Sequence, residues 1–220
     1  SHGLEGTVNE IEVYKGDLYV SSDRGLFRFS GKNGKAGKFE KLPPIENARR
    51  LVATDHALLI GSIYGLWAYR EDQLTQVFLG DSSFLDDSPL HPDRIYFGGF
   101  DGLHYAEWED PGGWLYGGPV DPEVDFYSLL IDGDGMVWLQ TGTGSIARYN
   151  PMEPDQGVQW FGESSGIPES DWITPLEVGG KVYLATTNSL LELDEESRQW
   201  KAARNLSYFP GEEEQHDFQF

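Results

Sequence analysis

The chain has 220 residues, a formal net charge of −21 and no cysteine. Such a negative surface repels phosphate backbones and anionic lipid headgroups, so we expect no nucleic-acid partner and no membrane contact by this segment. The lack of cysteine excludes disulfides and cysteine-ligated zinc, and no apolar run approaches the roughly 20 residues that a membrane-spanning helix needs.

A repeat occurs five times along the chain. Each copy has an apolar triplet, a short polar turn, a small residue and a second apolar run. The copies lie at 18–29, 58–69, 95–106, 137–149 and 182–193, with the small residue at Gly25, Gly65, Gly102, Gly144 and Ser189. A spacing of 37 to 45 residues, built from short strands, is typical of a β-propeller with one four-stranded blade per repeat. We therefore predict an all-β fold, a β-propeller of about five four-stranded blades, either complete or a fragment of a larger ring.

The predicted strands follow from this repeat, because the repeat itself supplies the second and third strand of each blade. The inner strands are expected at 8–14, 48–54, 84–90, 126–131 and 173–178, and the rim strands at 38–42, 75–79, 114–116, 158–161 and 199–203. A single domain over 1–220 then has blades at 8–45, 46–82, 83–122, 123–170 and 171–208. Residues 209–220 either close the ring or begin a further blade, because an open propeller leaves exposed strand edges.

The fourth and fifth repeats contain the most specific motifs. The fourth has DGDG (132–135) before VWLQT (137–141), and GIP (166–168) precedes VYLAT (182–186) in the fifth. With these motifs the chain resembles the two-component-regulator propeller repeat, most closely over about 125–194. The resemblance implies a sensor β-propeller of bacterial hybrid histidine kinases and related signalling proteins. It also implies a periplasmic or extracellular location, a ligand that is often an oligosaccharide, and no catalytic residue within the propeller.

Candidate binding residues lie in two sets of loops that a propeller gathers at one axial end. These loops vary without disturbing the core, so ligands usually bind there. The predicted ligand-binding residues are Arg49, Arg50, Tyr64, Phe84, Asp101, Asp125, Tyr127, Asp171 and Trp172, and the same loops contain Arg24, Asn47, Phe100, Thr143 and Asn188. Aromatic rings stack on the C–H faces of sugars, and charged groups bind hydroxyls. The alternative is that the aromatic rings pack between blades and the charges pair with one another.

Two neighbouring arginines give the most specific prediction of this set. Arg49 and Arg50 lie on an inner strand of a very acidic chain, so we expect them to have partners: a bound anion, or Asp125 and Asp171. We expect packing between blades for five tryptophans: Trp67, Trp114, Trp138, Trp160 and Trp200. Trp108 precedes a Gly-rich sequence and is expected in an exposed loop.

The sequence predicts no metal, no cofactor and no catalytic residue. The five histidines lack the spacing of a metal site, and the DGDG sequence departs from the calcium-loop pattern, so it is expected to form a hairpin turn. Adjacent acids in a strand point to opposite faces, so a glycosidase pair would need acids from two blades. Three functions stay open: a ligand-sensing propeller, a propeller glycosidase or lyase, and a protein–protein interaction scaffold. The expected partner is a small molecule or an oligosaccharide, and dimerisation with itself or with a signalling partner stays open.

Overall fold

The computed structural model describes residues 2–31, 37–42, 44–142, 144–169 and 172–203. In these residues twenty strands form five four-stranded antiparallel sheets, each a simple meander. The first blade is β1 (Val8–Tyr14), β2 (Asp17–Ser22), β3 (Gly25–Phe29) and β4 (Phe39–Leu42); the second is β5 (Ala48–Ala53), β6 (Leu58–Ser62), β7 (Gly65–Arg70) and β8 (Gln73–Phe78). The prediction of five four-stranded blades is confirmed.

The other three blades have the same plan. The third is β9 (Phe84–Asp87), β10 (Arg94–Gly99), β11 (Gly102–Glu109) and β12 (Gly113–Asp121); the fourth is β13 (Ser128–Ile131), β14 (Val137–Gln140), β15 (Ile146–Tyr149) and β16 (Val158–Phe161); the fifth is β17 (Thr174–Val178), β18 (Lys181–Ala185), β19 (Leu190–Asp194) and β20 (Gln199–Ala202). Two single-turn 3₁₀ helices, η1 (Pro154–Gln156) and η2 (Glu163–Ser165), flank β16.

The repeated glycine has a steric cause. A positive φ, which residues with a side chain rarely adopt, occurs at Gly25, Gly65, Gly102 and Gly144. A Cβ at Gly102 would lie 2.6 Å from the carbonyl oxygen of Asp121, on the strand that pairs with β11. In the first four blades the chain therefore turns from the second to the third strand at a residue without a side chain, whereas the fifth blade has Ser189 at this position and no positive φ there.

The hydrophobic core is divided into four layers, one between each pair of successive blades. In the first layer Tyr14, Tyr19 and Leu26 of the first blade pack against residues of the second, including Leu51 and Leu58. The other three layers join the second blade to the third, the third to the fourth and the fourth to the fifth. The blades are thus held together mainly by burial of apolar side chains between sheet faces.

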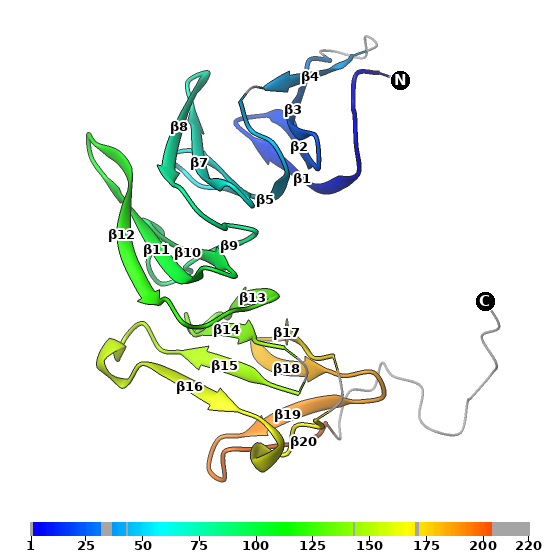
Figure 1. The fold of residues 1–220 in the computed structure, drawn as a ribbon, viewed down its shortest axis with the longest axis vertical. Helices are drawn as coiled ribbons and strands as arrows, with labels where there is room; N and C mark the ends of the chain where they lie inside the picture. The colour runs from blue at the N-terminus through cyan, green and yellow to red at the C-terminus, as the bar shows by residue number, and fades with distance from the viewer. Residues whose placement is uncertain (1, 32–36, 43, 143, 170–171, 204–220) are drawn as a thin grey trace, which may run out of the picture.

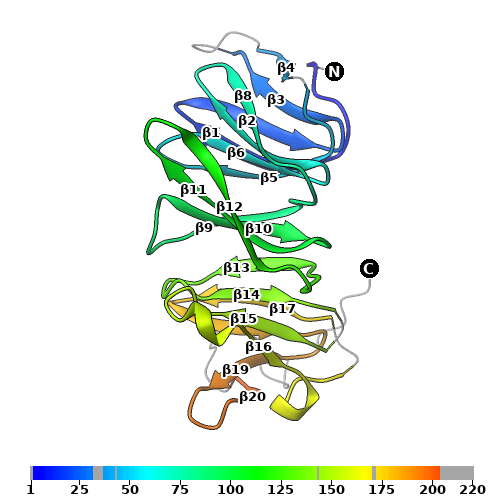
Figure 2. The ribbon, with the colours of Figure 1, turned by 60° about the vertical axis from the view of Figure 1, so that its left-hand side comes forward.

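The five blades follow one another around an open arc. The inner strands pack in sequence, β1 on β5, β5 on β9, β9 on β13 and β13 on β17, and no contact of comparable extent joins the fifth blade to the first among the described residues. Figures 1 and 2 show the first and fifth blades at opposite ends of this arc, with the inner strands on its concave side. Residues 209–220, predicted to close the ring or to begin another blade, lie outside the described residues.

Candidate functional site

Two sets of loops meet at one end of the propeller axis, on a surface that we call the axial loop face. They are the turns between the second and third strands of each blade and the connections between blades. The backbone N–H of Asp81, in the connection from the second to the third blade, donates to Asp101 in the β10–β11 turn over 2.7 Å. The Asp81 carboxylate in turn accepts the N–H of Phe100 over 3.0 Å. Loops of successive blades therefore hold one another in place on this face.

Three exposed aromatic rings form a row on the axial loop face. Phe100 meets Tyr127 with ring centroids 5.4 Å apart, and Tyr127 meets Trp172 at 5.8 Å, both edge to face. Phe100 is 59% exposed, Tyr127 40% and Trp172 54%. They come from the β10–β11 turn and from the connections that precede the fourth and fifth blades. We call these three residues the aromatic row. Two of them are in the predicted binding set, and the third lies in the same loops.

The arginine pair has a partner that the sequence did not indicate. The Arg50 guanidinium lies 3.0 Å from the Glu10 carboxylate on β1, and the other Glu10 oxygen accepts the N–H of Leu51. Arg50 therefore has a partner within the protein that the prediction did not name, and Asp171, one of the expected partners, lies outside the described residues. β1 and β5 pack side by side, so acids of the preceding inner strand reach the arginine first. Arg49, the preceding residue of β5, is exposed.

Asp86 is a second charged group of the inner strands. It lies on β9 and is half-buried. Burial raises the pKa of its carboxyl group to about 6, and the neighbouring Asp87 adds to this effect. Hydrogen bonds from the N–H groups of Ile131, over 3.1 Å, and of Asp87 act in the opposite direction. This carboxyl group joins the third blade to the fourth.

The remaining predicted residues divide into packed and exposed groups. Phe84 packs against Phe126 at 5.7 Å, within the core between the third and fourth blades, as the alternative of inter-blade packing expects. Tyr64, Asp101 and Asp125 are exposed on the axial loop face. Asp171 and Thr143 lie outside the described residues.

The other end of the propeller axis, which we call the hairpin face, contains hollows lined by residues of several blades. One of about 420 Å³ is lined by Lys15, Asp55, His56, Arg70, Asp93, Trp108 and Asp110. A larger one, about 610 Å³, lies between the fourth and fifth blades and is lined by residues that include Arg148, Glu153, Glu195 and Arg198. These residues come from hairpin turns and from the strands beside them, and none of them is in the predicted binding set.

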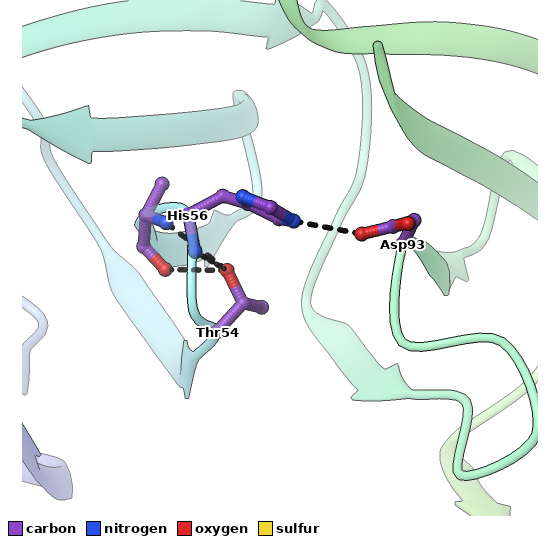
Figure 3. A network of polar contacts seen from close by, with 4 residues as sticks. Thr54, His56 and Asp93 are labelled. Atoms are coloured by element: carbon purple, nitrogen blue, oxygen red, sulfur yellow. Dashed lines mark hydrogen bonds and ion pairs between the residues drawn. The ribbon is translucent and has the colours of Figure 1, made fainter. Parts of the chain in front are cut away.

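A polar network on the hairpin face links the second blade to the third (Figure 3). The His56 Nε2 atom lies 2.7 Å from Asp93, and the His56 ring is parallel to Trp108, with ring centroids 4.3 Å apart. Thr54 accepts the N–H of His56 over 3.2 Å and so shapes this turn. The prediction that Trp108 lies in an exposed loop is wrong, because β11 extends to Glu109 and His56 covers the ring.

The DGDG sequence forms a turn, as predicted. The Asp132 carboxylate accepts the N–H groups of Asp134 and Met136 and the indole N–H of Trp138, the last over 2.7 Å. Within the described ranges, no group of three or more His, Asp or Glu side chains lies close enough together to hold a metal ion. A search of the same part of the chain for membrane spans finds no helix with the length and apolar content to cross a bilayer.

Sequence comparisons do not place the chain in a family. No family model matches it, and no curated protein sequence matches it. The similarities that exist are to solved structures, and they define the class of fold as a β-propeller.

Two of these structures are extracellular domains of hybrid two-component systems from B. thetaiotaomicron, BT4673 and BT3049. They share 19% and 14% identity with the chain, with TM-scores of 0.59 and 0.65. The alignments cover 90% and 91% of this chain but only 27% and 30% of those chains, so the chain spans less than a third of their length. The WD40 domain of Neurospora crassa Pan2 is similar at a TM-score of 0.63 and 9% identity, over 89% of this chain and 65% of that one.

Enzymes share the fold as well. An ancestral GH74 enzyme has a TM-score of 0.56 and a virginiamycin B lyase from Staphylococcus aureus one of 0.57, each at 13% identity. At such identities the likeness shows the propeller fold alone. The function must therefore be argued from the site.

Proposed function

We propose that the chain is a non-enzymatic recognition propeller of a bacterial signalling protein, periplasmic or extracellular, which binds a small polar ligand such as an oligosaccharide. The observation that carries this proposal is the aromatic row on the axial loop face. Three large rings stay exposed there although each would gain free energy by burial. Exposed apolar surface that is held in one arrangement is typical of a binding site.

The chemistry of the row suits a sugar. A pyranose has apolar C–H faces that stack on aromatic rings and hydroxyls that bond to charged groups at the rim. Asp101 and Asp125 are exposed on the same face. A row of rings from three successive loops favours an extended ligand, with one sugar ring on each side chain.

Recognition is favoured over hydrolysis by the openness of this face. A glycosidase needs two carboxyl groups that converge on one bond, roughly 5 to 10 Å apart. The rings of the aromatic row are 40 to 59% exposed, which describes a surface track rather than a closed cleft. The fold likeness to extracellular domains of two-component systems supports a sensing role, whereas the likeness to a GH74 enzyme and a lyase supports the alternative of catalysis.

A matched pair of tryptophans tests the site. Trp172 and Trp160 are both 54% exposed, but Trp160 lies on the rim strand β16. Affinity for a panel of neutral and acidic oligosaccharides is measured by calorimetry on the wild type, Trp172→Ala and Trp160→Ala. Trp172→Ala should weaken binding about tenfold or more, and Trp160→Ala should leave it unchanged. The absence of any binder, or equal affinity in all three proteins, contradicts the proposal. Chromatography of the recovered sugar tests the catalytic alternative, because cleavage contradicts the non-enzymatic assignment.

A further inference from the structure

Among the described residues, two blade faces have no neighbouring blade. We call the side of the first blade that points away from the second the leading face, and the side of the fifth blade that points away from the fourth the trailing face. Strand register shows which residue of an interior blade occupies the same position as each residue on these two faces. This comparison does not depend on the aromatic row or on any ligand.

The leading face has the residues of a blade interface but is exposed. In the second blade Leu51 pairs with Ile60, and both are buried against the first blade. The same register in the first blade pairs Ile11 with Val20, so Ile11 corresponds to Leu51. Leu51 is 2% exposed, whereas Ile11 is 60% exposed. Val13, the next residue on this face, is also exposed.

Part of the leading face is covered by the chain itself. Residues 2–7 bond to the β2–β3 turn and to β4: the Ser22 hydroxyl donates to the Glu5 carbonyl, and the Phe39 N–H donates to the His2 carbonyl over 2.7 Å. Val20 is accordingly buried, while Ile11 and Val13 on β1 are not. The exposed apolar surface is thus the half of the face next to the axis.

The trailing face has the residues that, in other blades, pack against the blade that follows. Tyr14, Tyr19 and Leu26 of the first blade are buried against the second. The register of the fifth blade places Val178, Tyr183 and Leu190 at the corresponding positions. Val178 is 47% exposed, compared with 5% for Tyr14, and Tyr183 and Leu190 are only partly buried. The two open faces are therefore apolar complements of the kind that pack against each other elsewhere in the arc.

The charges at these faces are reversed relative to the interior interfaces. At two of those, an arginine on the third strand reaches an acid in the last turn of the next blade: Arg28 with Asp72 over 2.7 Å, and Arg148 with Glu195 over 2.9 Å. In the fifth blade the same position is occupied by Glu192, paired with Lys181.

The first blade supplies the opposite charge. The segment between β3 and β4 ends with the exposed Lys38, which pairs with Glu40 over 3.4 Å, whereas the last turn contributes an acid at the two interior interfaces named above. Residues 1–50 contain nine basic and seven acidic side chains, whereas residues 171–208, the fifth blade, contain four basic and six acidic ones. An acidic trailing end and a basic leading blade attract each other.

We propose that two copies of the chain associate head to tail, with the trailing face of one copy on the leading face of the next. Apolar burial on Ile11 and Val178 drives the contact, and Glu192 facing Lys38 sets its direction. Such a contact joins two different surfaces, so each dimer keeps one open face at either end and adds further copies as the concentration rises. Salt weakens the association, because the charges are partly exposed.

Sedimentation velocity of the full 220-residue chain, from about 1 µM to about 200 µM, tests this arrangement. Ile11→Asp blocks the leading face, and Val178→Asp blocks the trailing face. Both side chains are largely exposed, so the fold should persist, which circular dichroism checks. Leu79→Asp, at an 80% exposed position between β8 and β9, is the control.

We expect the wild type and Leu79→Asp to grow in size with concentration, and each face variant alone to remain a monomer. An equimolar mixture of the two face variants should form a dimer and nothing larger, because one intact face of each kind remains. A monomeric wild type overturns the proposal and points to a further blade as the natural occupant of these faces. A mixture that stays monomeric, or face variants that associate like the wild type, also overturns it.

Discussion

Replacing Asp86 with asparagine should stabilise the propeller at neutral pH. The carboxyl group lies on β9 between the third and fourth blades, and its environment favours the neutral acid, with a pKa raised from 3.8 to about 6 by burial. Asparagine has the same shape and keeps an oxygen that accepts the N–H of Ile131. The substitution therefore removes a half-buried charge and keeps the hydrogen bond from Ile131, while the one from the Asp87 N–H to the other oxygen is lost.

The size of the effect follows from proton linkage. The folded-state pKa of Asp86 lies above its unfolded value, so this group contributes stability that is fully present below about pH 4 and is lost as the pH rises through about 6. Each tenfold change in proton affinity is worth about 1.4 kcal/mol, so ionised Asp86 costs the folded state about 3 kcal/mol at pH 8. The variant does not bear this cost.

Urea unfolding, followed by tryptophan fluorescence between pH 3.5 and pH 8 at constant ionic strength, measures the difference between the two proteins. The difference should be close to zero at the acid end and grow across the interval from about pH 4 to 6 in favour of the variant. Asp155→Asn is the control, because this aspartate is exposed and is not among the groups that shift the pKa of Asp86. A difference that is independent of pH, or a wild type that is the more stable protein at pH 8, would refute the reasoning.

Two further substitutions test the packing. His56→Ala should lower the free energy of unfolding by about 1 kcal/mol, because the stack on Trp108 is lost while the exposed ion pair with Asp93 adds little; thermal melting compares it with His91→Ala, an exposed histidine that should melt like the wild type. Gly102→Ala should cost about 2 kcal/mol or more, because an L-residue is strained at φ +100° and its Cβ would press on a backbone oxygen 2.6 Å away. Equal stability of Gly102→Ala and Gly112→Ala, where the nearest atom is 3.5 Å away, would contradict the steric argument.

The repeat predicted the blades well because strands and tight turns depend on neighbouring residues. Lys15 and Gly16 both have positive φ in a two-residue turn, and so do Gly179 and Gly180, as hairpins of this length require. Each of these turns is visible in a few letters of sequence. The order of strands in each sheet follows from the same short connections.

Contacts between blades could not be predicted in the same way. The partner of Arg50 is Glu10, forty residues earlier, and this pairing depends on how far one inner strand is displaced along the next. Trp160 was expected to pack between blades and is 54% exposed, because β16 is a rim strand with one side open to solvent. The loops of the aromatic row could be predicted, but not that their rings touch, since this depends on side-chain rotamers.

The open arc also determines how the molecule comes apart. An end blade is held on one face and an interior blade on two, so local opening should be easiest at the ends and hardest in the third blade, as in a linear array of repeats. Amide hydrogen exchange should accordingly be slowest in β10 and β11 and faster toward both ends. The aromatic row joins the third blade to the connections before the fourth and fifth, so a ligand bound there would fasten the fifth blade to the centre of the arc. Binding would then reduce the motion of the fifth blade without any displacement of the site itself.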